Sequence, residues 1–531
     1  MAPLINQGSW WLQMISTHHN HHLTPALFTI SLLILAILCY KFTFSTTPNG
    51  APSLPPGPRG LPIVGYLPFL GHDLHKQFTN LARSYGPIFK LQLGSKVHVV
   101  INTLDLAKTV VRDQDRTFSN RQPSIAAATS SYGTQDIVWS DNNSHWRNLR
   151  KILVQEVLSN KSLEACQSFR KNEVKKTIKN IYGNIGMAIN INEISFSTEA
   201  NVLTSIIWEN TTAEGAKDSS LVAELQMIVL EILELVSEPN ASDLFPNLAW
   251  FDLQGVERKT KKKLKQLDRI FTSIIDDRIK FNSKRSDGAV VEHEGKKDFI
   301  QTLLDLMEEK KATSLNFTQM KALLLDIMFG GTDTTATSIE WAMTEMMQNV
   351  NVMKRVQQEL VEIVGLNNVV EESHLPKLQY LDAVIKETFR LHPVLPLLLP
   401  RSPTQSCTVG GYTIPKGCIV FLNVWAIQRD PRNWDNPLEF NPERFMANKW
   451  DYKGNDLNFF PFGSGRRMCP GVPLAEKMQM YVLASLLHSF DWTLPKGEEH
   501  DFSDEFGIVL KKRKPLMAIA SQRLPNVSLY M

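Results

Sequence analysis

The segment "FFPFGSGRRMCPGVPLAE", residues 459–476, surrounds one cysteine with glycines and arginines. A free cysteine is most often a small buried hydrophobe, but here the neighbouring glycines remove side chains, so that a flat object can approach the backbone closely. Arg467 could hold an anion while the Cys469 thiolate meets a metal ion. Haem has both partners, because its iron needs an axial ligand and its propionates are anionic. The segment therefore predicts a haem-binding loop.

The spacing in this segment is specific. The pattern F-x-x-G-x-R-x-C-x-G is filled by Phe462, Gly465, Arg467, Cys469 and Gly471. It resembles the signature of the cytochrome P-450 family, the haem-thiolate monooxygenases. The resemblance covers roughly residues 50–520. It implies a mainly α fold with a smaller β part, one catalytic domain, and haem b with its iron bound by Cys469. The stretches "NRQPSIAAATSSYGTQDIVWSDNNSHWRNLRK" and "NVWAIQRDP" look most like plant microsomal members that act on specialised metabolites.

Two further motifs occur in the order typical of that family. "KETFR" places Glu387 and Arg390 three residues apart on one helix face, and "FNPERF" adds Arg444. In the family these three residues form a buried ion cluster beneath the haem. Because buried charges need compensating partners, the expected role of this cluster is core assembly.

A second motif, "FGGTDTT", interrupts a long apolar helical pattern over residues 317–348. Gly330 and Gly331 weaken the helix, and threonine hydroxyls can bond its carbonyls, so that a local bulge is expected. Asp333 and Thr334 match the family's acid–alcohol pair, which delivers protons during oxygen activation. We therefore expect these two residues to be catalytic.

Several cations are expected to face the haem propionates. "WRNLR" supplies Trp146 and Arg150, four residues apart on one helical face. The resemblance implies that both hydrogen-bond a propionate, and it adds Arg401 in "LLLPRSP" and Arg467. Such charge-assisted hydrogen bonds match cations to the two carboxylates.

The expected substrate contacts are mostly apolar. By resemblance they come from residues 123–132, 228–235 and 325–330, from "VLPLLLP" and from "FGIV". The side chains that we expect to line the pocket are Val394, Leu395, Leu398 and Ile508. A greasy pocket with few polar anchors predicts a lipophilic small molecule. A terpenoid, for example a sesquiterpenoid, is favoured over a flavonoid or another phenolic.

The N-terminus is expected to anchor the protein. Residues 23–40 are 18 residues without a charge, near the lower limit for spanning a bilayer; the alternative, a cleaved signal peptide, lacks a basic n-region and a small-residue cleavage site. Residues 1–22 then form a lumenal tail, whose "HHNHH" could alternatively bind metal. Residues 41–62 form a stiff proline-rich linker, and residues 63–531 form the haem-thiolate monooxygenase domain.

Charge and motif content limit the possible partners and locations. The net charge is only +3 and no stretch concentrates it, which argues against nucleic acid. Positive charges on the C-terminal side of the anchor predict a single-pass protein of the endoplasmic reticulum membrane, with the catalytic domain in the cytosol.

The electron source is predicted to be a separate protein. No flavin or dinucleotide fingerprint occurs in the sequence. The predicted enzyme is therefore a monooxygenase that uses O2, a lipophilic substrate and electrons from NADPH–cytochrome P-450 reductase. The alternatives are a haem-thiolate isomerase or dehydratase and a non-catalytic haem-binding protein.

Overall fold

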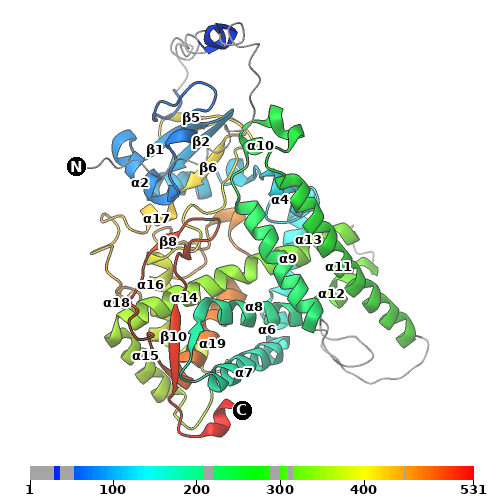
Figure 1. Cartoon of the computed structure of the whole chain (residues 1–531), viewed down its shortest axis with the longest axis vertical. Helices are drawn as coiled ribbons and strands as arrows, with labels where there is room; N and C mark the ends of the chain where they lie inside the picture. The colour runs from blue at the N-terminus through cyan, green and yellow to red at the C-terminus, as the bar shows by residue number, and fades with distance from the viewer. Residues whose placement is uncertain are drawn as a thin grey trace, which may run out of the picture.

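The computed structural model describes residues 29–35, 37, 53–208, 219–286, 298–308, 315–447 and 450–531 (Figure 1). The expected tail, residues 1–22, and most of the expected anchor and linker lie outside these residues. Within the described ranges, no helix combines the length and the apolar character needed to cross a membrane. The described end of the linker packs on the body, because the Lys90 N–H donates to the Pro56 carbonyl at 2.8 Å.

The fold is mainly helical, as predicted. Its helices are α2 (Leu74–Tyr85), α3 (Leu104–Lys108), α4 (Ile125–Ser130), α5 (Ser144–Ile152), α6 (Asn160–Ala165), α7 (Gln167–Gly183), α8 (Ile191–Ile207), α9 (Ser219–Ser237), α10 (Ala241–Leu244), α11 (Val256–Ser286), α12 (Phe299–Glu308), α13 (Phe317–Gly331), α14 (Asp333–Gln348), α15 (Val350–Ile363), α16 (Gln379–Leu391), α17 (Val424–Ile427), α18 (Glu443–Ala447) and α19 (Val472–Ser489).

The strands form small sheets. They are β1 (Ile88–Leu93), β2 (Lys96–Ile101), β3 (Ala188–Asn190), β4 (Cys407–Val409), β5 (Tyr412–Ile414), β6 (Ile419–Leu422), β7 (Phe490–Thr493), β8 (Asp504–Glu505), β9 (Lys511–Lys512) and β10 (Met517–Gln522). One sheet has the order β1-β2-β6, with β1 antiparallel and β6 parallel to β2. A second has the order β3-β10-β7, and β4-β5 and β8-β9 are two-stranded.

The core lies among the helices. Figure 1 shows the strands of the first sheet at one end of the molecule with α2, and most helices packed beside and below them. Helix α14 is almost wholly buried and packs against α8, α16 and α19. Because α14 continues the chain from α13, this pair carries the "FGGTDTT" motif through the middle of the protein.

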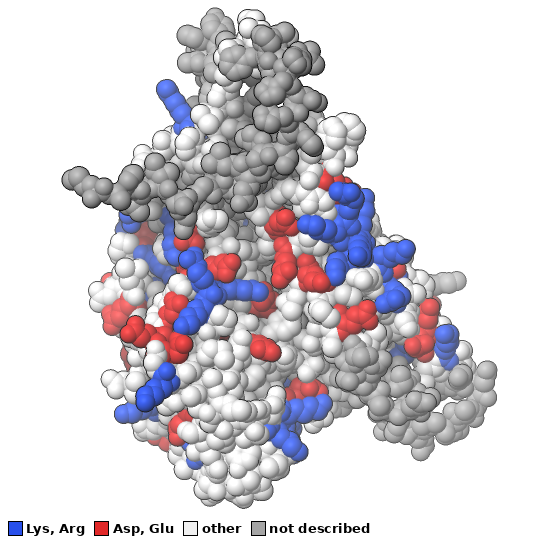
Figure 2. Space-filling model, viewed as in Figure 1, with Lys and Arg blue, Asp and Glu red and all other residues white. Residues whose placement is uncertain are grey.

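Acidic and basic side chains are interspersed over the face seen in Figure 2. This mixture agrees with the small net charge of +3.

Candidate functional site

The Cys469 loop lies between a 3-10 turn, Gly465–Arg467, and α19. The Cys469 N–H donates to the Phe462 carbonyl at 3.0 Å, which closes the loop. The Gly471 N–H donates to Cys469 Sγ at 3.3 Å, whereas Pro470 has no N–H to offer. Desolvation by the surrounding protein raises the pKa of the Cys469 thiol, and the Gly471 N–H and the Arg150 charge oppose this rise.

The glycines of this loop serve different purposes. Gly463 and Gly465 have φ of 74° and 71°, the left-handed region that favours glycine. A Cβ on Gly465 would lie 2.4 Å from the Val111 carbonyl oxygen and 2.5 Å from Asp115 Oδ1. Contact with residues 111–115 therefore requires glycine at position 465, and the approach of a flat ligand to this loop stays a prediction.

The four residues expected at the propionates lie around this loop. Arg150 donates to the Met468 carbonyl at 2.6 Å, and Arg401 donates to the Ser464 carbonyl at 2.6 Å. The Arg467 guanidinium lies 4.3 Å from the centre of the Trp146 ring. These side chains come from α5, from the bridge that pairs Arg401 with β6, and from the 3-10 turn. The structure thus gathers residues that are widely separated in sequence.

Trp146 and Arg467 share one acceptor. Trp146 Nε1–H donates to the Ile137 carbonyl at 2.9 Å, and Arg467 donates to the same carbonyl at 3.2 Å. Arg467 also donates to the Ser119 carbonyl at 2.6 Å and to the Ser140 carbonyl. The loop before α5 therefore fixes both side chains.

The sequence motifs did not reveal a fifth residue of this cluster, Arg121. Its guanidinium donates to the carbonyls of Leu399 and Pro400 at 2.5 and 2.7 Å. Burial, and then the charges of Arg467 and Arg401, hold the pKa of Arg121 well below its usual range. Arg121 stands in "NRQPS", and a single arginine near a proline is not typical of a ligand-binding motif. Only its proximity to the other cations in the structure indicates a role in binding an anion.

The charges of this cluster suit a dianionic ligand. Four guanidinium groups meet here, those of Arg121, Arg150, Arg401 and Arg467. Among the described residues two largely buried carboxyl groups oppose them: Asp115 lies 3.4 Å from Arg401, and Asp136 acts on Arg121 and Arg467. The charge of surface residue Asp141 acts on Arg467 more strongly than that of Asp136, and the half-exposed Arg466 shares Asp115 at 3.2 Å. About two buried positive charges remain without a buried partner. This excess is equal in size and opposite in sign to the charge of the two haem propionates, so that the residues present fit the cofactor.

The helical pattern over residues 317–348 breaks, as expected, at the glycine–threonine motif. Thr332 separates α13 from α14, with φ −89° and ψ −74°. Its hydroxyl donates to the Met328 carbonyl at 2.8 Å, and the Thr334 hydroxyl donates to the Gly330 carbonyl at 2.7 Å.

Asp333, the first residue of α14, is buried. One of its carboxylate oxygens lies 2.8 Å from Lys511 Nζ of β9. No pattern in the sequence indicates this lysine, because β9 lies far from α14 along the chain.

Glu387, Arg390 and Arg444 form a cluster between α16 and α18. Arg390 donates to both carboxylate oxygens of Glu387 at 2.6 and 2.8 Å, and Arg444 lies 3.3 Å from that carboxylate. Glu387 and Arg390 are fully buried. The cluster ties α16 to the segment that precedes the cysteine loop.

Two of the expected substrate segments lie side by side. The Leu510 N–H donates to the Val394 carbonyl at 2.8 Å, which places Ile508, two residues earlier, near "VLPLLLP". Leu398 has φ 50°, and its side chain lies 3.7 Å from the position of a Cβ on Gly463. Val394 is buried, whereas Leu395, Leu398 and Ile508 are half-buried. Leu398 therefore lies close to the cysteine loop.

Comparison with known proteins identifies the family. The family model of Cytochrome P450 matches residues 55–519. This chain belongs to the cytochrome P450 family. Members of that family bind haem b through a cysteine thiolate, so that this cytochrome P450 is an oxidoreductase of the monooxygenase type. It works with a small-molecule substrate, O2 and a redox partner.

The relatives of this cytochrome P450 come from plants. It is 38% identical to Cytochrome P450 76C1 of Arabidopsis thaliana, over 94% of this chain and 98% of that protein. It is 38% identical to a flavonoid 3',5'-hydroxylase of Solanum melongena (89% and 91%). It is 36% identical to a probable (S)-N-methylcoclaurine 3'-hydroxylase of Coptis japonica (94% and 99%).

The fold of this cytochrome P450 also resembles solved structures. A zebra fish cytochrome P450 with abiraterone matches 85% of this chain and all of that one, with a TM-score of 0.69 and 23% identity. At this identity the likeness shows that the two proteins share the P450 fold.

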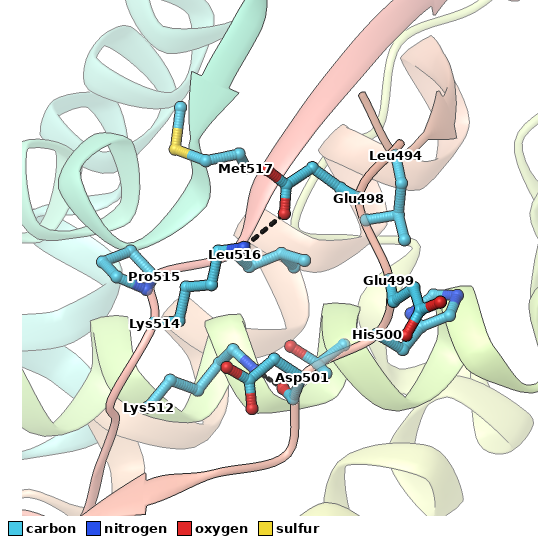
Figure 3. A pocket seen from close by; sticks show the side chains of 11 residues that line it. Leu494, Glu498, Glu499, His500, Asp501, Lys512, Lys514, Pro515, Leu516 and Met517 are labelled. Carbon is cyan, nitrogen blue, oxygen red and sulfur yellow. Dashed lines mark hydrogen bonds and ion pairs between the residues drawn. The ribbon is translucent and has the colours of Figure 1, made fainter. Parts of the chain in front are cut away.

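A small pocket of this cytochrome P450 lies outside the predicted site. Figure 3 shows it between residues 494–501 and 512–517, with an ion pair between Glu498 and Lys514. Its lining contains none of the residues that the sequence singled out for haem or substrate.

Proposed function

We propose that this cytochrome P450 is a plant microsomal monooxygenase that hydroxylates a lipophilic specialised metabolite, with Cys469 as the iron ligand. The observation that carries the proposal is the group of buried cations around the Cys469 loop, whose excess charge matches two propionates. Arg150, Arg401 and Arg467 hold the propionates, Trp146 packs against the Arg467 guanidinium at the same site, and Arg121 adds to their positive field. Phe462 and Gly471 complete the loop around the thiolate.

When bound, haem supplies the capacity to activate O2. The residues of the chain position the groups around it. Asp333 and Thr334 lie at the break between α13 and α14, where a hydroxyl and a carboxylate can pass protons inward. Lys511 holds the Asp333 carboxylate at 2.8 Å and connects it to the surface. The Glu387–Arg390–Arg444 cluster supports the segment beneath the cysteine loop.

The substrate is an apolar ring system. Val394, Leu395, Leu398 and Ile508 line its pocket with hydrocarbon. The leucine-rich segment alone favoured a terpenoid, such as a sesquiterpenoid. Relatives named for flavonoid and N-methylcoclaurine hydroxylation make an aromatic substrate an equal candidate. These names also favour oxygen-dependent hydroxylation over isomerisation, dehydration or non-catalytic haem binding.

The cellular arrangement follows the family. Residues 1–22 form a lumenal tail, residues 23–40 a single anchor in the endoplasmic reticulum membrane, residues 41–62 a linker and residues 63–531 the cytosolic catalytic domain. The expected electron donor is NADPH–cytochrome P-450 reductase. The support is that the sequence carries no dinucleotide fingerprint of its own.

The experiment expresses the full chain in microsomes with a reductase. Reduced wild-type protein exposed to carbon monoxide should show the red-shifted band of thiolate ligation, and Cys469→Ser should lose both the band and turnover. A panel of sesquiterpenes and flavonoids, assayed with NADPH by mass spectrometry, then identifies the substrate class. A wild-type-like band in the serine variant would rule out Cys469 as the ligand.

A further inference from the structure

Two buried aspartates outside the expected site meet between α13 and the loop before α5. Asp326 lies on α13 and Asp136 lies in residues 134–140. They are 9% and 1% exposed. Asp136 directly precedes Ile137, whose N–H donates to Asp326 Oδ2 at 2.8 Å, so that the two carboxyl groups hold one short stretch of loop. Because two neighbouring carboxylates in the protein interior ionise together only at a high cost, a single proton on the pair is favoured.

The loop that carries Asp136 is shaped around its carboxylate. The Trp139 N–H and the Ser140 N–H both donate to it at 3.1 Å. The Ile137 N–H, directly after Asp136, instead donates to Asp326 Oδ2 at 2.8 Å. The two carboxyl groups thus satisfy three N–H groups of one short loop and attach it to α13.

Ile137 connects this attachment to the arginine cluster. Its N–H is held by Asp326, while its carbonyl accepts from Trp146 at 2.9 Å and from Arg467 at 3.2 Å. The Ile137 carbonyl lies between two anchored donors, because the Ile137 N–H donates to Asp326 and the Trp139 N–H donates to Asp136. The loop backbone is therefore held by the two carboxyl groups on both sides of this carbonyl.

Charged groups around the pair favour one proton on it. Burial first, and then the charge of Asp136, raise the pKa of Asp326 well above its usual range. Burial raises the pKa of Asp136 to about 6, against the effects of its backbone N–H donors and Arg467. Arg121 also acts on Asp136. The cations thus face Asp136, so that Asp326 is the protonated member near neutral pH.

The helices packed on α13 carry charged groups of their own. From α8, Glu199 is buried, and burial raises its pKa well above its usual range. From α9, Glu224 pairs with Arg269 of α11 at 3.1 Å. On α13 itself, Lys321 pairs with Asp268 of α11 at 2.7 Å.

We propose that Asp326 and Asp136 are a proton-sharing carboxyl pair whose positioning role is to fix the Ile137 carbonyl, and through it Trp146 and Arg467, for haem binding. The role rests on the proposed function, in which Arg467, packed against Trp146, holds a propionate. It makes Asp326 a positioning residue on the helix that also carries the expected substrate contacts.

The pair should make haem retention depend on pH. The folded-state pKa of Asp326 is raised above its unfolded value, so that its stabilising effect is present at low pH and is lost as pH rises through that raised pKa. Loss of the shared proton places two carboxylates in contact and loosens the loop from α13. Haem release should therefore accelerate toward alkaline pH.

The experiment measures transfer of haem from the full-length holoenzyme to excess apomyoglobin, followed by absorbance between pH 6 and 9. Asp326→Asn keeps an acceptor for the Ile137 N–H and donates an amide N–H to Asp136. It should hold haem as the wild type does at neutral pH and lose the alkaline acceleration. Asp326→Ala strands the Ile137 N–H and should release haem roughly tenfold faster at neutral pH.

The matched control is Asp243→Asn. Asp243 also accepts a buried backbone N–H, that of Ile125 at 2.7 Å, and burial raises its pKa, but no acidic group is among the influences on it. This variant should keep the wild-type pH profile. An Asp326→Asn profile that accelerates like the wild type, or an alanine variant that retains haem as tightly as the wild type, overturns the proposal.

The assignment of Cys469 and the role of the carboxyl pair are tested by different measurements. A wild-type holoenzyme without the thiolate band in carbon monoxide would overturn the assignment of Cys469. A normal band together with an unchanged pH profile in Asp326→Asn would overturn only the carboxyl pair. If the alanine variant does not fold, the comparison of asparagine with wild type still decides the matter.

Discussion

Arg390→Met should destabilise the protein strongly because it leaves a buried carboxylate with weaker partners. Arg390 donates to Glu387 at 2.6 and 2.8 Å and to the carbonyls of Gln428, Pro437 and Glu439 at 3.0, 2.8 and 3.0 Å. Methionine fills much of the space but donates nothing. Removing one partner of a buried ion pair costs about 3–5 kcal/mol. Arg444 remains 3.3 Å from Glu387, so that we expect a value near the lower end, about 3 kcal/mol.

The assay is urea unfolding, followed by haem absorbance and by circular dichroism. With a slope of about 3 kcal/mol per molar urea, the midpoint should fall by roughly 1 M. The control, Lys171→Met, breaks the exposed pair with Glu371, whose side chains are 52% and 46% exposed, and should cost at most about 1 kcal/mol. Equal midpoints for the two variants would refute the reasoning.

A double variant isolates the cause. Glu387→Met combined with Arg390→Met removes the stranded charge as well as its partner. It should therefore be more stable than Arg390→Met alone, since apolar replacement of a buried pair costs less than breaking it. A double variant less stable than the single one would show that packing, and not the unpaired carboxylate, sets the cost.

Three further outcomes are expected. Thr334→Ala should keep haem and substrate binding but divert electrons from product into hydrogen peroxide, measured as product formed per NADPH consumed; unchanged coupling would contradict its proton-delivery role. Pro470→Leu adds a second N–H beside the Cys469 sulfur and should raise the ferric/ferrous potential, a rise that spectroelectrochemical titration would detect; a potential that stays constant or falls leaves Pro470 only a backbone role. Although desolvation acts the other way, Lys76 at 2.5 Å and His75 at 3.6 Å lower the pKa of Asp504 to about 2, so that Asp504 contributes about 1 kcal/mol above pH 4 once solvent screening is included. This contribution should disappear as the pH falls from about 4 to 2, and acid unfolding of Asp504→Asn should lack that part of the wild-type transition.

Local patterns predicted much of the fold. The apolar helical pattern over residues 317–348 forms α13 and α14, and Glu387 and Arg390 lie on α16. The break between α13 and α14 was predictable because glycines and threonine hydroxyls compete locally with helical hydrogen bonds. In each case the residues that decide the structure are neighbours in sequence.

The contacts between distant segments could not be predicted in this way. Asp326 and Ile137 are 189 residues apart, and neither "LLLDIM" nor "TQDIVW" carries a pattern that requires the other. The pairing of Asp333 with Lys511 depends on where the β8–β9 hairpin packs. Arg121 joins the cationic cluster only because the cysteine loop and residues 137–140 fold around it. Such partners follow from the tertiary packing, which no short window of the sequence encodes.

The unbalanced arginine cluster makes haem supply a determinant of how much protein is folded. A ligand that binds the folded state stabilises it by an amount that grows with the logarithm of its free concentration. Here that ligand also removes the mutual repulsion of Arg121, Arg401 and Arg467, which already depresses the pKa of Arg121. The melting temperature should therefore rise with free haem concentration. A cell that produces this chain faster than haem would accumulate the form most exposed to aggregation and proteolysis.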